Sequence, residues 1–287
     1  MTFQSIEYGV EDRIATITLN RPERLNAIDD AMPAEISAAV RLAEEDKAVH
    51  VVVVTGSGRA FCSGYDLELY AENPDAPTNQ SMPWDPTIDY AGMSANTEHF
   101  MSLWRCNKPT VAKVRGYAVA GGSDIALSCD LVVMAEDANI GYPPARVWGC
   151  PTTAMWVYRV GAEQAKRMLF TGDLIDGLEA KRIGLVLDAV PDSELDERVD
   201  DIVLRIAGVP QNQLMMHKLM INQAIDNMGL PTSQMFATLF DGIARHSPEG
   251  VRFKHRAEEV GFRAAVAERD SGEPIGGGTD AEGTSAT

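Results

Sequence analysis

Apolar and polar residues follow different periods in the two halves of the chain. In the first half, Arg13–Asn20 alternates apolar and polar side chains, which predicts a strand with one buried face. Val49–Gly56 is a run rich in β-branched residues, which predicts a strand buried on both faces. Between them, Ala31–Asp46 repeats its apolar residues at helical spacing. The first half therefore alternates strands with helices.

The same order recurs further along the chain. Residues 109–122 (PTVAKVRGYAVAGG) predict a strand that leads into a Gly-rich turn, and Ser123–Asp130 predicts a short helix. Residues 131–135 (LVVMA) predict another buried strand. Repeats of strand, turn and helix indicate an α/β core with crossover connections.

The helical period dominates from about Gly161 onward, and we predict an all-helical C-terminal region there. The chain then divides into an α/β core over residues 1–205 and a helical region over residues 206–270. Residues 271–287 are rich in Gly, Ser and Thr and nearly free of large apolar residues, which predicts a disordered tail.

An insertion interrupts the core over residues 70–100. The stretch from Tyr70 to Asn107 has four prolines and few aliphatic residues in its first half, so we expect a long surface excursion before a helix around Met93–Trp104. Loops of this length inside a compact domain usually serve as lids or binding loops. A solvent-facing insertion or a subunit contact is the other interpretation.

Composition narrows the classes of function. The net charge is −17, from 42 acidic against 25 basic residues, which argues against binding to a nucleic-acid backbone. A small anionic ligand held by a few local groups is still compatible with this charge. No run approaches the ~18 apolar residues of a membrane span, and the N-terminus has no signal-peptide pattern, so we expect a cytoplasmic protein.

The four cysteines are scattered, without the paired spacing of a metal site or a disulfide framework. They are Cys62, Cys106, Cys129 and Cys150, and each stands among apolar or small residues. This setting favours buried free thiols, and no motif indicates a metal.

Two Gly-containing segments carry a resemblance to a known family. The first is Gly58–Tyr70 (GRAFCSGYDLELY), and the second is Val114–Pro143 (VRGYAVAGGSDIALSCDLVVMAEDANIGYP). In order and spacing they resemble the paired signature of the crotonase (enoyl-CoA hydratase/isomerase) superfamily. Residues 17–29 (ITLNRPERLNAID) and the helical segment after Gly161 are also similar to that family, so the resemblance covers about residues 5–270.

The resemblance implies a fold and an assembly. The fold would be a spiral of ββα units with perpendicular sheets and a C-terminal helical trimerisation region. The assembly would be a homotrimer or a dimer of trimers, with Leu214–Met220 and Met235–Ile243 as subunit contacts, although core packing would also explain their apolar faces.

The family's chemistry implies an oxyanion site. Crotonases bind an acyl-CoA thioester and stabilise the enolate, or another oxyanion, with two backbone N–H groups, one of them at a helix N-terminus. By position, these donors are Tyr65 and Gly121. The alternative is that the neighbouring glycines serve only tight strand–helix packing. The CoA belongs to the substrate, and no separate cofactor is implied.

The resemblance also assigns contacts to the CoA part of the substrate. By position these are Arg24, Ala27, Ser63, Asp66 and Leu67. Arg24 could pair with a phosphate, whereas an exposed Arg after a proline turn is commonly solvated.

The acid–base residues depart from the family pattern. Hydratases of the family use two glutamates that share a water, one as base and the other as acid. The first position falls on Asp124, whose carboxylate would be set back by roughly 1.5 Å, a misplacement that can cost about 100-fold in rate. Alternatively, Asp124 has only a structural role, as an acidic residue that the helix dipole favours near a helix N-terminus. The second glutamate position falls on Pro144.

The wall around Pro144 also differs from the family. Tyr142, Pro144 and Trp148 would form an apolar, aromatic wall suited to a bulky acyl group, and Arg146 could anchor an anionic end. Alternatively, Trp148 packs in the core and Arg146 points to solvent. Replacement acids or bases could come from the insertion, which carries Asp85, Asp89, Tyr90 and His99.

Three functions remain open from the sequence. The first is hydration or isomerisation of an enoyl-CoA, with Asp124 as acid–base residue. The second is another crotonase reaction, such as thioester hydrolysis, decarboxylation or carbon–carbon cleavage. The third is a non-catalytic acyl-CoA binder.

Overall fold

A six-stranded sheet forms the centre of the computed structural model, which describes residues 2–76, 80 and 83–272. β1 runs antiparallel to β2, and the remaining neighbours in this sheet are parallel. In spatial order the strands are β1 (Ile6–Glu11), β2 (Ile14–Leu19), β3 (Val51–Gly56), β4 (Thr110–Val114), β6 (Leu131–Ala135) and β9 (Asp188–Val190).

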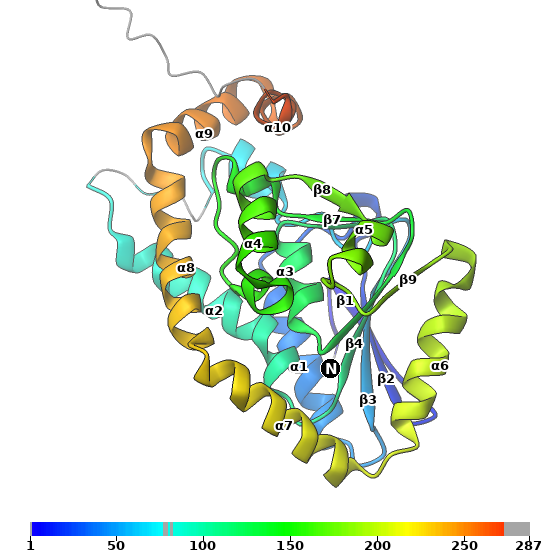
Figure 1. Cartoon of the computed structure of the whole chain (residues 1–287). Coiled ribbons are helices and arrows are strands. Elements are labelled where there is room, and N and C mark those ends of the chain that lie inside the picture. The colour runs from blue at the N-terminus through cyan, green and yellow to red at the C-terminus, as the bar shows by residue number, and fades with distance from the viewer. Residues whose placement is uncertain (1, 77–79, 81–82, 273–287) are drawn as a thin grey trace, which may run out of the picture.

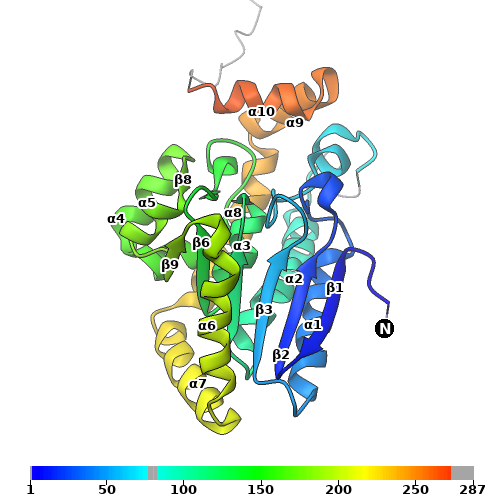
Figure 2. The same cartoon turned by 90° about the vertical axis from the view of Figure 1, so that its right-hand side faces the viewer.

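Helices cover both faces of this sheet. α1 (Met32–Glu45) packs against β1 and β2, and α6 (Leu195–Ala207) packs against the other face over β3, β4 and β6 (Figure 2). Residues 51–54 of β3 are buried because both of its faces are covered. This arrangement is typical of a parallel sheet, whose crossover connections put helices on its faces.

A smaller sheet lies beside the first. It consists of β5 (Tyr117–Val119), β7 (Asn139–Gly141) and β8 (Leu174–Asp176), and β7 and β8 run across the direction of β3 and β4 (Figure 1). The neighbouring helices are α3 (Gly121–Ser128), α4 (Met155–Thr171), which is broken at Gly161, and α5 (Gly177–Arg182). All residues of α3 are buried. α3 therefore lies inside the molecule, directly after the second Gly-rich turn.

The remaining helices wrap the outside of the core. α2 packs against α1, α3 and α8, and the long pair of α7 and α8 runs along one side, with α9 and α10 at its far end (Figure 1). Their bounds are α2 (Pro86–Arg105), α7 (Gln211–Asn227), α8 (Leu230–His246), α9 (Pro248–Val260) and α10 (Phe262–Asp270). Short helical turns are η1 (Pro22–Arg24), η2 (Glu68–Glu72), η3 (Pro143–Ala145) and η4 (Asp192–Glu194).

The structure confirms the elements with the clearest periods. The predicted strands become β2, β3, β4 and β6, and the predicted helices become α1 and α3, with ends shifted by one or two residues. The cysteines are free, and Cys62, Cys106 and Cys129 are buried while Cys150 is half-buried. β1 has no counterpart in our prediction.

One prediction about the elements is wrong, and another is correct only in part. The region after Gly161 is not all-helical, because β8 and β9 form there; strands of three residues are too short to show a period of two. The helix around Met93–Trp104 begins earlier, at Pro86, where Asp85 caps it by accepting a hydrogen bond from the Thr87 N–H at 2.9 Å. Much of the predicted excursion is therefore helix.

The remaining predictions concern the domain limits. The predicted core ends at residue 205, and α6 continues to Ala207 before α7 begins at Gln211. Of the predicted disordered tail, residues 273–287 lie outside the described residues.

Candidate active site

Two Gly-rich turns from different parts of the chain are joined by backbone hydrogen bonds. The Cys62 N–H donates to the Tyr117 carbonyl at 2.8 Å, and the Val119 N–H donates to the Cys62 carbonyl at 3.0 Å. Gly122 allows this approach, since a Cβ there would lie 2.2 Å from the Cys62 carbonyl oxygen. The turn that ends at Tyr65 and the turn that opens α3 therefore lie side by side.

Each turn presents a backbone N–H group without a protein acceptor. Among the described residues, none accepts a hydrogen bond from the N–H of Tyr65 or of Gly121. The backbone groups on either side of the Tyr65 N–H do form hydrogen bonds within the chain. The Gly64 carbonyl accepts from the Ile28 N–H at 2.8 Å, and the Asp66 N–H donates to the Ile28 carbonyl at 3.0 Å. Enclosed N–H groups are normally paired, so this pair indicates a place for an oxygen atom of a ligand.

The two unpaired donors lie close to each other. A Cβ on Gly121 would lie 3.1 Å from Cε2 of the Tyr65 ring, and a Cβ on Gly64 would lie 3.5 Å from the Gly121 nitrogen. Gly121 is the first residue of α3, where the helix dipole favours negative charge. Ala120, just before it, has φ 52° and ψ −123°, a conformation that L-residues rarely adopt. Such local strain is typical of functional turns.

Asp124 lies in the first turn of α3 and is almost fully buried. Its carboxylate accepts a hydrogen bond from the Thr153 hydroxyl. Burial, opposed by the hydrogen bonds from Thr153 and aided by the charge of Asp241, raises the pKa of Asp124 to about 7. A carboxyl with a pKa near neutrality can both accept and donate a proton at physiological pH.

A second buried carboxyl, Asp241 of α8, lies in the same region, and we did not predict it. Its Oδ1 accepts from the Cys150 N–H at 3.0 Å, and its Oδ2 lies 3.1 Å from Nη2 of Arg245. Burial raises the pKa of Asp241 even though Arg245 lowers it. Sequence offers no signal for this residue, because it stands on a helix far along the chain with no motif around it.

Tyrosine and threonine side chains surround these carboxyls. The Tyr65 hydroxyl accepts from the Asn96 amide at 3.3 Å, and the Tyr142 hydroxyl donates to the Cys150 carbonyl at 3.0 Å. Burial raises the pKa of both tyrosines, and the charges of Asp124 and Asp241 raise it further. The two aromatic hydroxyls and the two carboxyls are therefore close enough for their charges to influence one another.

The residues assigned to CoA contacts lie around the first turn. Ser63 donates its N–H to the Leu25 carbonyl at 3.1 Å, which holds the turn beside η1. Arg24 is exposed and forms an ion pair with Glu68, whereas Asp66 is buried and lies 3.1 Å from Nη2 of Arg21. Ala27 is buried and Leu67 is half-buried. The structure thus brings Arg24, Ala27, Ser63, Asp66 and Leu67 together beside Tyr65.

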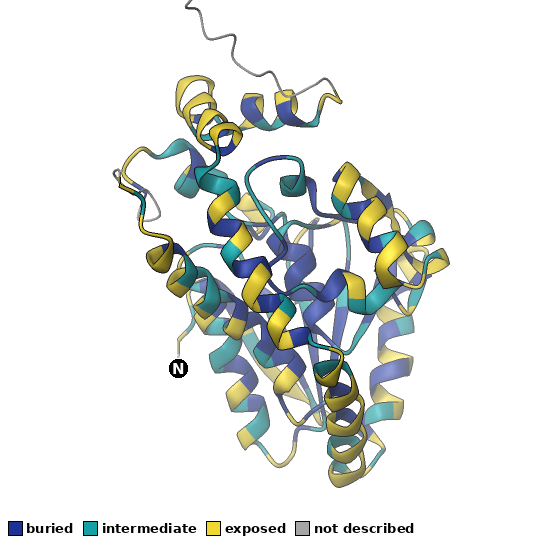
Figure 3. Cartoon of the chain, turned by 60° about the vertical axis from the view of Figure 1, so that its left-hand side comes forward, coloured by how far each residue is buried: buried dark blue, intermediate teal, exposed yellow. Residues whose placement is uncertain are grey.

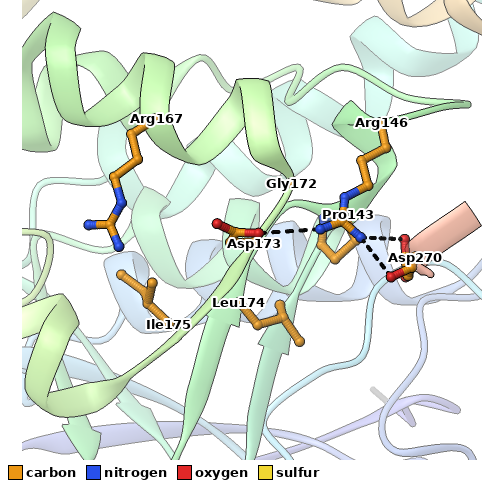
Figure 4. Close-up of a pocket in the computed structure, with 8 residues that line it drawn as sticks. All are labelled: Pro143, Arg146, Arg167, Gly172, Asp173, Leu174, Ile175 and Asp270. Atoms are coloured by element: carbon orange, nitrogen blue, oxygen red, sulfur yellow. Dashed lines mark hydrogen bonds and ion pairs between the residues drawn. The ribbon is translucent and has the colours of Figure 1, made fainter. Parts of the chain in front are cut away.

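Arg146 lies elsewhere. It lines a surface pocket of about 270 Å³ together with Arg167 and Ile175, and its guanidinium lies 3.3 Å from both Asp173 and Asp270 (Figure 4). It does not point into solvent. None of these contacts is shared with Asp124 or the two turns, so the structure does not bring Arg146 to the site.

Trp148 and Tyr142 pack in different apolar clusters. The ring of Trp148 packs against Phe253 of α9, with centroids 5.4 Å apart, in a small apolar cluster that also includes Leu67. Trp148 has φ 84°, the left-handed region in which glycine is normal. Pro144 is half-buried and contributes no ionisable group to the site.

The acid–base candidates in the insertion differ in burial. Asp85 is exposed and caps α2, and Tyr90 and His99 are half-buried. Asp89 is buried, where it accepts from the Trp84 indole at 2.6 Å and lies 3.3 Å from Nδ1 of His246. The start of α2 is thereby tied to α8 of the same chain.

No metal-holding cluster and no membrane-spanning helix is found in the described part of the chain. Over residues 2–76, 80 and 83–272, no group of three or more His, Cys, Asp or Glu side chains could hold a metal ion. Within the same residues, no helix combines the length and the apolar character needed to cross a bilayer.

Known proteins match this chain along most of its length. The family model described as enoyl-CoA hydratase/isomerase matches residues 9–253. A putative enoyl-CoA hydratase of Thermus thermophilus is 33% identical over 251 residues, which cover 83% of this chain and 93% of that protein.

Solved structures agree with this match. The crystal structure of enoyl-CoA hydratase from Mycobacterium smegmatis is 49% identical, covers 94% of each chain and has a TM-score of 0.89. That of an enoyl-CoA hydratase/isomerase from Xanthobacter autotrophicus Py2 is 33% identical, covers 95% of this chain and 100% of that chain, and has a TM-score of 0.87.

The fold and these matches define the class of protein. The chain belongs to the enoyl-CoA hydratase/isomerase family, within the crotonase superfamily. The predicted family and the predicted fold class, ββα units followed by a helical C-terminal region, are thereby confirmed.

Proposed function

We propose that this protein binds an acyl-CoA thioester and forms its enolate in a reaction of the enoyl-CoA hydratase/isomerase type. The N–H groups of Tyr65 and Gly121 would stabilise the thioester oxygen, and Asp124 would move the proton at the α-carbon. The observation that carries this proposal is the pair of adjacent, unpaired N–H donors with a buried carboxyl one turn along the same helix.

The chemistry follows from charge development at the thioester. Removing a proton from the α-carbon, or adding a nucleophile to the β-carbon of an enoyl-CoA, moves an electron pair onto the thioester oxygen. Two fixed N–H groups and the α3 dipole stabilise that oxygen more strongly as it becomes negative, which lowers the barrier rather than only improving binding. The near-neutral pKa of Asp124 allows it to accept the proton and return it.

The CoA part of the substrate would lie across the first turn. Arg24, Ala27, Ser63, Asp66 and Leu67 are grouped there, and Arg24 could exchange its exposed partner Glu68 for a phosphate. No cofactor beyond the CoA carried by the substrate enters this reaction. We place the reaction in the cytoplasm.

We also propose that the protein assembles as a homotrimer or a dimer of trimers. α7 and α8 carry many exposed residues (Figure 3), and several of these residues are large and apolar. This set, the α7–α8 face, consists of Met216, Leu219, Met220, Ile221, Met228, Met235, Phe236, Phe240 and Ile243. A concentration of exposed apolar side chains on two successive helices is typical of protein–protein contacts.

Proton exchange at the α-carbon tests the proposed reaction without knowledge of the natural acyl group. Butyryl-CoA is incubated with the protein in heavy water, and deuterium at the α-carbon is followed by NMR. We expect exchange by the wild-type protein and a loss of about 100-fold or more in Asp124→Asn, because the amide cannot accept the proton.

The other outcomes lead to other conclusions. If calorimetry shows that butyryl-CoA binds but no α-proton exchange occurs, the protein is a non-catalytic acyl-CoA binder. Exchange that persists in Asp124→Asn would make Asp124 structural. Absence of binding would contradict the proposal altogether.

A further inference from the structure

Asp241 is a buried carboxyl that the proposed function does not use. It is 5% exposed and lies in the last two turns of α8, facing the loop that follows η3. An ionised carboxylate is expensive to bury unless it is fully paired. Asp241 has a partner for each oxygen, since Oδ1 accepts from the Cys150 N–H at 3.0 Å and Oδ2 lies 3.1 Å from Nη2 of Arg245.

The position of the Asp241 carboxylate is fixed relative to Pro144 and Tyr142. A carbon atom added to Gly149 would lie 2.8 Å from Cβ of Pro144, and 3.6 Å from both Oδ1 of Asp241 and the hydroxyl of Tyr142. One added atom would therefore touch all three groups. Where Pro144 brings no ionisable group, α8 brings a carboxyl from another part of the chain.

Asp241 on α8 and Asp124 on α3 come from different elements, and they are close enough for the charge of one to influence the other. The charge of Asp241 acts on Asp124 and on the two tyrosines that surround it. The titratable or charged groups that act on Asp241 or on which it acts are Asp89, Arg245, Cys150, Tyr65, Tyr142 and Asp124. Arg245 and the Cys150 N–H favour the ionised form of Asp241.

We propose that Asp241 is a second acid–base residue of this site, and that it activates water for addition to an enoyl-CoA while Asp124 serves the α-carbon. This inference rests on the proposed function, because it assumes that the thioester oxygen lies between the N–H groups of Tyr65 and Gly121. The reaction it assigns is hydration.

The step balances with water as the co-reactant. The Asp241 carboxylate takes a proton from water, and the water oxygen forms a bond to the β-carbon. The π electrons of the double bond move onto the thioester oxygen, where the two N–H groups stabilise them. The enolate then collapses and takes a proton from Asp124 at the α-carbon. Transfer of the proton from Asp241 back to Asp124 restores both residues.

Because Asp241 would act on water and Asp124 on the α-carbon, loss of Asp241 should reduce hydration but not α-proton exchange. A purely structural role would not produce this difference. Asp241→Asn retains an oxygen that can accept from the Cys150 N–H but cannot take a proton from water. We expect hydration of crotonyl-CoA, followed as loss of the enoyl absorbance, to fall about 100-fold or more. Exchange of the butyryl-CoA α-proton in heavy water requires only Asp124 and should stay within about threefold of wild type.

Asp188→Asn is the matched control for loss of a partly buried ion pair. Asp188 is the first residue of β9, outside the site, and its Oδ2 lies 2.7 Å from Nε of Arg198 on α6. The control should lose stability without losing either activity.

The outcomes separate this inference from the proposed function. If Asp241→Asn loses hydration and exchange together, or keeps hydration, Asp241 is not the second acid–base residue. If the wild-type protein exchanges the α-proton but does not hydrate crotonyl-CoA, the inference fails and the proposed function stands. If it does neither, the proposed function fails and this inference with it.

Discussion

At the scale of single residues, the ionisation of Asp124 is linked to folding. Its carboxyl has an ordinary pKa of 3.8 and a pKa of about 7 in the folded chain, mainly because burial disfavours the charge. Between these values the folded protein holds a proton that the unfolded chain has released. The free energy of unfolding contributed by Asp124 therefore falls as pH rises from 3.8 to about 7, and above pH 7 this contribution is fully lost.

We accordingly expect Asp124→Asn to stabilise the protein in a pH-dependent way. The gain should be a few kcal/mol at about pH 8 and small at about pH 4, since a tenfold change in a dissociation constant corresponds to about 1.4 kcal/mol. Urea denaturation of both proteins at the two pH values measures the difference. An equal effect at both would show that the Asp124 charge does not destabilise the fold.

The ionisation of Asp188 should change stability with pH in the opposite direction. Its pKa is lowered by the pairs with Lys181 and Arg198, although burial opposes this. Its contribution to stability is present at neutral pH and is lost as pH falls through the lowered pKa, so Asp188→Asn should destabilise the protein more at about pH 8 than in acid.

At the scale of elements, the site depends on how closely two turns approach each other. Gly122 carries no side chain because the Cys62 carbonyl occupies the space where a Cβ would lie. Since backbone atoms form this contact, neither side can yield without moving α3 or the Cys62 turn. The distance between the two turns also sets the distance between the unpaired N–H groups.

Gly122→Ala should therefore impair stability and the site together. We expect a loss of about 1–3 kcal/mol or more in the free energy of unfolding, with weaker binding of butyryl-CoA by calorimetry. Gly9→Ala is the matched control, because a Cβ there would meet no atom within 4 Å and Gly9 lies on β1 with no positive φ. Similar stabilities of the two variants would contradict the steric explanation.

At the scale of the whole molecule, the α7–α8 face leaves much apolar surface uncovered. Met220 is 65% exposed and Met228 is 68% exposed. Scattered apolar residues are normal on protein surfaces, but this face follows two successive helices on one side of the chain (Figure 3). Covering it by further copies of the chain would remove it from water.

We expect light scattering after size exclusion to give a mass of three chains or a multiple of three. Met220→Glu combined with Phe236→Glu should shift the mass towards that of one chain, because the interface would then bury two unpaired charges. Val10→Glu, at an exposed apolar position on β1, should leave the assembly unchanged. A wild-type protein of single-chain mass would contradict the proposed assembly.

The sequence by itself determined the class of fold and the two turns of the site. Val51–Gly56 predicts a buried strand because its β-branched residues suit a strand covered on both faces. Tyr65, Gly121 and Asp124 could be identified because they lie beside the two Gly-rich turns that carry the family resemblance, which assigns their roles by position. Pro144 stood out because it replaces an acid that the family resemblance implies.

Only the tertiary structure decided what surrounds those turns. The neighbours of Asp124 come from the loop before α4 and from α8, and no local pattern records which distant side chains will meet. Arg146 and Trp148 stand close to Pro144 in sequence, yet they turn towards α9, α10 and the pocket of Figure 4. Asp241 lies beside Cys150 because α8 packs along α2, a contact set by the burial of whole helix faces.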